Sequence, residues 1–329
     1  MELLEPTEEN IRRAGEALAA GRLVAIPTET VYGLGADAFN ERAVARVFEA
    51  KARPSFDPLI VHIAELSQAD RVVRELPAAA RALMERLWPG PLTLILPKRA
   101  EVPDLVTSGL DTVALRFPSN TVAQAVIRAA GTPVAAPSAN PFGYLSPTTA
   151  HHVAAMLGAR VDFIVDGGPC AIGVESTVLD VTGERPVVLR PGGMPVETIE
   201  EVVGPVEILD RTDARPTSPG QLPSHYAPRT RLLLVPAGGL AWAKPKGRAA
   251  ALVFDDRSRA ALTASRASRA FRVLRVLSPG ADLLEAAARL FSTLHELDRG
   301  GFDEIWAERL PEEGLGRAVN DRLYKASEK

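Results

Sequence analysis

Short apolar runs that are typical of β-strands alternate with helix patterns over the first two hundred residues, and this alternation most constrains the fold. Several runs are continuously apolar, as expected for strands covered on both faces of a sheet. Such a pattern indicates an α/β domain, and because it is irregular in the middle we expect a mixed sheet rather than a parallel one. The expected strands are residues 23–26, 59–63, 92–96, 113–115, 134–136, 163–165, 177–181 and 187–189, and the expected helices are 78–87, 121–130 and 149–157.

Capping residues mark the first two helices. Thr7 is a suitable N-cap for a helix that Gly21 closes, with Ile11 and Leu18 on its apolar face. Asn40 can cap a second helix in the same way. The pattern therefore predicts a helix before and after the first strand.

Length and composition indicate two domains. The chain has 329 residues, which exceeds the usual size of one domain. Five prolines between residues 205 and 228 indicate a semi-stiff linker or extended arm. A second α/β pattern follows, with strands at 231–235, 249–254, 273–277 and 304–307, a helix that begins at Asp282, and a final helix at 316–326. We expect a first domain at residues 1–204, a linker at 205–229 and a smaller α/β domain at 230–329.

Composition excludes several classes of protein. A net charge of −3 gives no general attraction to nucleic acid or to anionic membranes, so any RNA contact would need a local basic patch. The single cysteine, Cys170, excludes an internal disulfide framework and a cysteine-rich zinc site. The acidic N-terminus does not resemble a signal peptide, and no apolar stretch is long enough to span a bilayer. We expect a cytoplasmic protein.

Two polar turns follow apolar strands and suggest a ligand site. Residues 27–35 (PTETVYGLG) follow the first strand, and residues 137–140 (PSAN) follow the strand at 134–136. Ligands of open α/β sheets bind at the carboxyl ends of strands. Ser138 and Asn140 offer a hydroxyl, an amide and nearby backbone N–H groups, as in a phosphate nest. The two turns therefore favour a nucleotide triphosphate as ligand.

Four cations stand at the ends of predicted elements. Lys51 and Arg53 end a helix that Pro54 prevents from continuing. Two interpretations stay open for this pair: the cations compensate the helix dipole, or both side chains lean over one anionic ligand. Arg116 and Arg190 each end a strand shortly before a proline, where a guanidinium group can bind carboxylate or phosphate. Together the four cations favour a polyanionic substrate.

Other chemistries fit the pattern poorly. Ser176 lacks the flanking glycines of a nucleophile elbow and has no evident His–Asp partner, which excludes a serine hydrolase. Residues 33–35 form only a GxG, so neither a Rossmann fingerprint nor a Walker loop is present. His62 ends an apolar strand and is as readily a core histidine as a ligand-binding one. His151 and His152 begin a helix and lack further metal ligands.

The sequence motifs of this chain, taken in their order, resemble those of the YrdC-like threonylcarbamoyl-AMP synthases in the long form, which has a C-terminal domain. The resemblance covers nearly the whole chain and implies an open twisted mixed sheet with helices, followed by a smaller Rossmann-like α/β domain. It rests on PTETVYGLG, KARP, PLIVH, WPGPLT, APSAN, GVESTV, LRPG, SPGQLPSHYAP and GLGRAVNDRL, at residues 27–35, 51–54, 58–62, 88–93, 136–140, 173–178, 189–192, 218–228 and 314–323.

The resemblance also implies the reaction and the residues that perform it. Members of the family convert L-threonine, bicarbonate and ATP into threonylcarbamoyl-adenylate and pyrophosphate, and the product serves threonylcarbamoylation of adenosine in tRNA. By this resemblance, the residues of this chain expected to contact threonine are Thr30, His62, Arg116, Ala136 and Ser176. The contacts with ATP fall on Lys51, Arg53, Asp57, Thr112, Ser138, Asn140, Ser146, Arg190 and, from the linker, Tyr226. Asp57 departs from the family, which usually has asparagine there.

The expected chemistry needs positioning and charge neutralisation more than a protein nucleophile. Threonine's amine takes up carbon dioxide, and the resulting carbamate attacks the α-phosphorus of ATP. Lys51 and Arg53 are the expected catalytic residues, because they would stabilise the triphosphate and the departing pyrophosphate, together with Mg²⁺ bound to ATP. Arg116 would bind the carboxylate of threonine.

Two alternatives remain open at this point. One is a carbamoyl-adenylate enzyme of the hydrogenase-maturation type, although a single cysteine cannot supply the zinc fingers of those proteins. The other is a non-catalytic module that binds double-stranded RNA. The expected partners of a synthase are the machinery that transfers its product to tRNA and, through a local patch, RNA itself.

Overall fold

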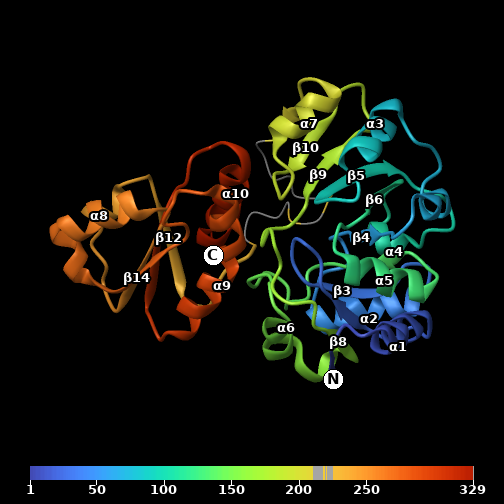
Figure 1. The fold of residues 1–329 in the computed structure, drawn as a ribbon, viewed down its shortest axis with the longest axis horizontal. Helices are drawn as coiled ribbons and strands as arrows, with labels where there is room; N and C mark the ends of the chain where they lie inside the picture. The colour runs from blue at the N-terminus through green and yellow to red at the C-terminus, as the bar shows by residue number, and fades with distance from the viewer. Residues whose placement is uncertain (210–217, 219, 221–224, 329) are drawn as a thin grey trace. The chain divides into compact units, whose positions relative to one another are not determined.

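The computed structural model describes residues 1–209, 218, 220 and 225–328 (Figure 1). The chain divides into two compact units, which are described separately. Unit 1 comprises Met1–Phe142, Ser146–Ala171 and Glu175–Leu222, and unit 2 comprises Gly143–Leu145, Ile172–Val174 and Pro223–Lys329. Most of the expected linker, including Gln221 and Ser224 of its motif, lies outside the described residues.

Unit 1 is built on a mixed sheet with the strand order β1-β8-β2-β3-β7-β4-β6-β5-β9-β10-β11. Parallel pairs such as β4–β6 and β5–β9 stand beside antiparallel pairs such as β2–β3 and β5–β6, which confirms the expected mixed sheet. The strands are β1 (Glu2–Leu4), β2 (Val24–Ile26), β3 (Gly33–Asp37), β4 (Ile60–His62), β5 (Leu92–Pro97), β6 (Thr112–Arg116), β7 (Val134–Ala135), β8 (Phe163–Val165), β9 (Thr177–Asp180), β10 (Val187–Arg190) and β11 (Glu207–Ile208).

The N-caps expected for the first two helices of unit 1 are confirmed, and a third residue caps a later helix in the same way. Thr7, Asn40 and Thr149 each accept a hydrogen bond from a backbone N–H in the first turn of the helix that follows. The helices are α1 (Glu8–Ala19), α2 (Glu41–Lys51), α3 (Ala78–Leu87), α4 (Asp104–Thr107), α5 (Thr121–Ala130), α6 (Ala150–Leu157) and α7 (Val196–Val203), with 3-10 turns η1 (Leu66–Arg71) and η2 (Gly158–Arg160).

Two apolar layers cover the two faces of the sheet. Leu23 and Ala25 pack in one core with residues of α2, α3 and α6, whereas Val24 and Ile26 pack in another with residues of α1 and α5. Successive residues of a strand point to opposite faces, so this partition is the expected result of a continuously apolar strand. Helices α1 and α5 pack against each other on one of these faces.

Strand β3 was missed by the sequence pattern, which treats residues 27–35 as a turn. The strand starts at Gly33 and pairs with β2 on one side and β7 on the other. A Cβ atom on Gly35 would lie 2.9 Å from Cγ1 of Val134 and 3.1 Å from the carbonyl oxygen of Val24. Glycine is needed here because neighbouring strands approach too closely for a side chain, and not because a turn is formed.

Unit 2 contains a four-stranded parallel sheet in the order β12-β15-β13-β14. The last strand in sequence, β15, lies between the first two. This confirms the smaller α/β domain expected after the linker. Its elements are β12 (Arg231–Val235), η3 (Gly239–Trp242), β13 (Ala249–Val253), α8 (Asp256–Ala264), η4 (Arg266–Ala270), β14 (Phe271–Val276), α9 (Leu283–Arg299), β15 (Glu304–Glu308) and α10 (Gly314–Ser327).

Two short segments from earlier in the chain complete unit 2. Within Gly143–Leu145, the hydroxyl of Tyr144 donates a hydrogen bond to Asp298 of α9. Within Ile172–Val174, a Cβ atom on Gly173 would lie 2.5 Å from Cα of Ala288, so this glycine permits close contact with α9. Among the described helices, none has both the length and the apolar character needed to cross a membrane.

Candidate active site

A row of polar side chains crosses the centre of the unit 1 sheet. His62 and Arg116 are the last residues of the parallel strands β4 and β6 and are paired in register. Arg116 is also paired with Thr93 of β5 on its other side. The sheet therefore brings together two residues predicted to bind threonine and adds Thr93, which the sequence did not single out.

Arg116 is buried, with its guanidinium group fixed by three hydrogen bonds. Nη2 donates to Oε1 of Glu29 at 2.6 Å, Nη1 donates to Oγ1 of Thr30 at 2.9 Å, and Nε donates to the carbonyl oxygen of Gly90 at 3.4 Å. The Arg116 side chain is 4% exposed and that of Glu29 8%. A guanidinium group has five N–H groups, so two remain for a ligand carboxylate.

His62 is held in its neutral form by its surroundings. Its ring Nδ1 lies 3.1 Å from the carbonyl oxygen of Ile60. Burial lowers the pKa of His62 to about 3, and the nearby charge of Arg116 acts in the same direction. Since a carbonyl oxygen can only accept, Nδ1 carries the proton and Nε2 is the acceptor, which suits a ligand hydroxyl group better than a carboxylate.

Ser176 connects the row to a second arginine. Its hydroxyl lies 2.8 Å from Oγ1 of Thr93, and its carbonyl oxygen accepts a hydrogen bond from Nη2 of Arg190 at 2.8 Å. Arg190 ends β10 and is buried. Ala136 follows β7 and donates its backbone N–H to the carbonyl oxygen of Ile60 at 2.9 Å. All five residues predicted to bind threonine thus lie in unit 1. Four of them, His62, Arg116, Ala136 and Ser176, are at or next to a strand end, and Thr30 lies in the loop between β2 and β3.

Lys51 supports the turn that was predicted to bind phosphate. It is the last residue of α2, and its ammonium group donates to the carbonyl oxygens of Ser138 at 2.5 Å and Asn140 at 2.6 Å. The side chain is buried, which lowers the pKa of Lys51 well below its ordinary value, with the charge of Arg53 acting in the same direction. Lys51 therefore fixes the residue 138–140 turn in addition to any contact with a ligand.

Arg53 and Asp57 form a buried ion pair at the entrance to β4. Arg53 Nη2 lies 2.9 Å from Oδ2 of Asp57, and the same guanidinium group donates to the backbone oxygens of Asp57 and Pro58. Burial raises the pKa of Asp57, whereas the charges of Arg53, Lys51 and Arg190 oppose that shift. Three of the predicted ATP-binding cations thus act electrostatically on one carboxylate, and Arg53 also contacts it directly.

The remaining predicted ATP contacts lie in several parts of the fold. Ser146 is buried and its hydroxyl is hydrogen-bonded to Glu175. Thr112 begins β6 and so lies about 13 Å along the strand from Arg116. Tyr226 belongs to unit 2, where it is 1% exposed and packs against the rings of His225 and Phe291, with the guanidinium group of Arg322 above its ring.

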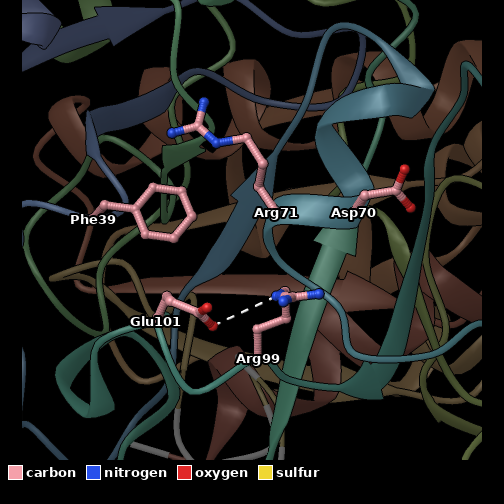
Figure 2. Close-up of a pocket in the computed structure, with 5 residues that line it drawn as sticks. All are labelled: Phe39, Asp70, Arg71, Arg99 and Glu101. Atoms are coloured by element: carbon pink, nitrogen blue, oxygen red, sulfur yellow. Dashed lines mark ion pairs between the residues drawn. The ribbon is translucent and has the colours of Figure 1, made fainter.

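A surface hollow of about 420 Å³ in unit 1 is lined by none of the predicted residues (Figure 2). Its lining consists of Phe39, Asp70, Arg71, Arg99 and Glu101. Figure 2 shows the ion pair between Arg99 and Glu101 across its floor. Since this hollow is open and carries two cations and two anions, it has no marked preference for a polyanion.

Three buried polar residues beside the predicted ones were not identified from sequence: Glu29, Thr93 and Glu175. Glu29 and Glu175 lie inside the segments PTETVYGLG and GVESTV, directly before Thr30 and Ser176. Their only sequence signal is that an acidic residue interrupts an otherwise neutral motif.

Cys170, also buried, has a raised pKa because of burial and the charge of Glu29, as expected for an unreactive thiol.

Comparison with known proteins decides the family. A family model described as "Telomere recombination" matches residues 16–192, and one described as "Threonylcarbamoyl-AMP synthase, C-terminal domain" matches residues 194–328. A curated threonylcarbamoyl-AMP synthase from Pyrococcus abyssi is 44% identical over 324 residues, covering 97% of this chain and 94% of that protein. The chain belongs to the threonylcarbamoyl-AMP synthase family. A second member, from Bacillus subtilis, is 43% identical and covers 98% of this chain and 94% of its own length.

One solved structure is similar over nearly the whole chain, and another over somewhat more than half of it. The crystal structure of P. abyssi Sua5 complexed with L-threonine matches with a TM-score of 0.89 at 41% identity and covers 99% of this chain and 97% of that one. The structure of Escherichia coli YciO covers 58% of this chain and 94% of its own, with a TM-score of 0.52 at 27% identity. The long two-domain form of the family, inferred from the sequence motifs, is thereby confirmed.

Proposed function

We propose that this chain is an L-threonylcarbamoyladenylate synthase, which forms threonylcarbamoyl-AMP and pyrophosphate from L-threonine, bicarbonate and ATP. The observation that carries the proposal is the buried guanidinium group of Arg116, which has two N–H groups left for a carboxylate and stands in register between His62 and Thr93. This arrangement suits a small amino acid that also carries a hydroxyl. The near full-length similarity to named synthases supports it.

Within this proposal, the buried cations receive the nucleotide. Arg53 and Arg190 lie near the same carboxylate, that of Asp57, and Lys51 holds the turn that contains Ser138 and Asn140. These groups would neutralise the triphosphate and stabilise pyrophosphate as it leaves. No covalent intermediate with the protein is required, because the carbamate of threonine attacks the α-phosphorus directly.

Mg²⁺ would accompany ATP as a Lewis acid. Magnesium sites in nucleotide enzymes commonly use one or two carboxylates together with phosphate oxygens and water. Oδ1 of Asp57 is buried and makes no hydrogen bond, so this carboxylate has a lone pair for such a role. Among the described residues no cluster of three or more metal-ligating side chains occurs.

The decisive experiment measures pyrophosphate release from ATP with the purified full-length protein. Release that requires both L-threonine and bicarbonate, with threonylcarbamoyl-AMP detected by mass spectrometry, is expected. Release that depends on carbamoyl phosphate instead would indicate the carbamoyl-adenylate reaction. Binding of double-stranded RNA without any release would indicate a non-catalytic module.

The product also sets the expected partners and location. Threonylcarbamoyl-AMP is a labile mixed anhydride, so we propose transfer to the machinery that modifies adenosine in tRNA, in the cytoplasm. Direct RNA binding by a local basic patch is part of the same proposal. Transfer of labelled threonine to tRNA in a cell extract with and without this protein would test it.

A further inference from the structure

Glu29 carries a buried carboxylate oxygen that has no partner. Its Oε1 accepts a hydrogen bond from Arg116, but Oε2 is buried and makes no hydrogen bond to any described residue. The residue as a whole is 7% exposed. Buried carboxylate oxygens are normally hydrogen-bonded, because loss of hydration without a replacement donor is costly. An unpartnered oxygen of this kind suggests that a ligand supplies the donor.

The position of this oxygen matches the chemistry of an amino acid. In a free α-amino acid the carboxylate and the ammonium group are attached to the same carbon atom. In the site, a guanidinium group with two unused N–H groups and a carboxylate with an unused oxygen are joined by a hydrogen bond of 2.6 Å. A cation and an anion side by side are complementary to the two charges of a zwitterion.

We propose that Oε2 of Glu29 accepts a hydrogen bond from the α-ammonium group of L-threonine, whose α-carboxylate is bound by Arg116. The inference rests on the proposed function and names a residue that the sequence did not identify. It makes Glu29 a determinant of specificity for amino acids over hydroxy acids. It also places beside the carboxylate the nitrogen that is to become the carbamate.

A purely structural role for Glu29 makes a different prediction. If Glu29 only orients Arg116, its replacement would weaken the binding of every carboxylate ligand to the same degree. If Glu29 binds the ammonium group, replacement would weaken only those ligands that carry one. The two roles are therefore separated by comparing ligands and not by the loss of activity alone.

The test compares Glu29→Gln with the wild type by calorimetric binding in the presence of a non-hydrolysable ATP analogue. Glutamine keeps an oxygen that can accept from Arg116 but removes the charge. L-Threonine is compared with 3-hydroxybutanoate, which lacks the amino group, and with L-threonine methyl ester, which keeps the amino group and lacks the carboxylate charge. We expect threonine and its ester to bind roughly ten- to a hundred-fold more weakly to the variant. Binding of 3-hydroxybutanoate should change by less than about three-fold, near the lower end of what a single neutral hydrogen bond contributes, because this ligand has no ammonium group to contact Oε2.

Asp37→Asn provides a matched control, because Asp37 is a carboxylate of unit 1 that accepts a side-chain hydrogen bond from Thr132 at 2.9 Å and is not among the predicted ligand contacts. It should leave the ratio of threonine to 3-hydroxybutanoate affinity unchanged. Equal weakening of all three ligands by Glu29→Gln, or no weakening of any, would overturn the inference. If the wild type binds threonine but releases no pyrophosphate, the proposed function fails and the role of Glu29 is still decided by the binding data.

Discussion

The ammonium group of Lys51 lies 2.6 Å from the carbonyl oxygen of Asn140, so the end of α2 is tied to the turn that follows β7. A helix-terminal lysine would ordinarily extend into solvent near the helix dipole. Here the side chain is buried and joins two segments separated by 89 positions in sequence. Of the two interpretations left open by the sequence, neither includes this role.

Replacement of Lys51 by methionine should affect both stability and ATP use. The backbone oxygens of Ser138 and Asn140 would lose a buried charged donor, which typically costs about 1.5–3 kcal/mol of unfolding free energy. The KM for ATP should rise because the 138–140 turn loses its support. Thermal unfolding and steady-state kinetics measure the two effects. An unchanged melting temperature with a raised KM would show that the lysine acts only on the ligand.

Replacement of Asp57 by asparagine tests the departure from the family's usual residue. Burial raises the pKa of Asp57, so the folded state resists its ionisation. Below the ordinary pKa of 3.8 this penalty is absent; it grows as the pH rises above 3.8 and is complete once the pH exceeds the raised pKa. The stability of Asp57→Asn relative to the wild type should therefore increase as the pH rises above 3.8 and then level off. Chemical denaturation at several pH values measures this difference, and a decrease over the same range would contradict it.

His62 should make the folded state sensitive to acid. Its pKa is lowered from 6.5 to about 3, so the unfolded chain takes up a proton at a pH where the folded one does not. The contribution of His62 to the free energy of unfolding is fully present above pH 6.5. It is lost as the pH falls toward 3, by at most about 1.4 kcal/mol per pH unit. His62→Gln should lack this loss. If the free energy of unfolding had the same pH dependence in the wild type and in His62→Gln, His62 would not be buried in its neutral form.

Selectivity among amino acids should follow the hydroxyl rather than the methyl group. A site that pairs with a substrate hydroxyl rejects analogues that lack it more strongly than analogues that lack a methyl group. L-Serine should therefore have a higher kcat/KM than L-valine, and Ser176→Ala should narrow the difference. Equal kcat/KM values for valine and threonine in the wild type would exclude His62, Thr30 and Ser176 as the polar side of the pocket.

A conservative substitution is needed at Tyr226, because its side chain is buried and packs against the rings of His225 and Phe291. Tyr226→Ala should cost about 3–5 kcal/mol by removing a buried aromatic ring. Tyr226→Phe keeps the ring beside His225 and Phe291 and should be far less destabilising. If the hydroxyl takes part in adenylate formation, Tyr226→Phe should lower kcat while the protein stays folded at the assay temperature. Wild-type kinetics in this variant would assign Tyr226 a structural role only.

Most of the architecture could be predicted from sequence because local patterns determine it. The helices at 78–87 and 121–130 and the strand at 231–235 are found at the expected residues, since apolar periodicity and caps act over short distances. Strand β3 could not be predicted, because the need for Gly35 comes from Val134, about a hundred residues away.

The candidate site was predictable in its residue types but not in its contacts. Cations at strand ends and polar turns are local features of the sequence, and they indicate Arg116 and Ser138 directly. The register that aligns His62 with Arg116, and the burial that turns Lys51 toward backbone oxygens, depend on tertiary packing. The acidic residue within PTETVYGLG was too weak a signal to assign a role to Glu29, because an isolated glutamate in a sequence does not reveal whether it is paired.

The strand order of unit 2 has a consequence for biosynthesis. Strand β15 lies between β12 and β13 and is hydrogen-bonded to both. Of the four strands of this sheet, β15 is synthesised last. During translation, β12 and β13 therefore cannot be joined in one sheet until Glu304–Glu308 has left the ribosome. A nascent chain that stalls before this strand leaves two apolar strand edges unpaired, which is the state most open to aggregation and to capture by chaperones.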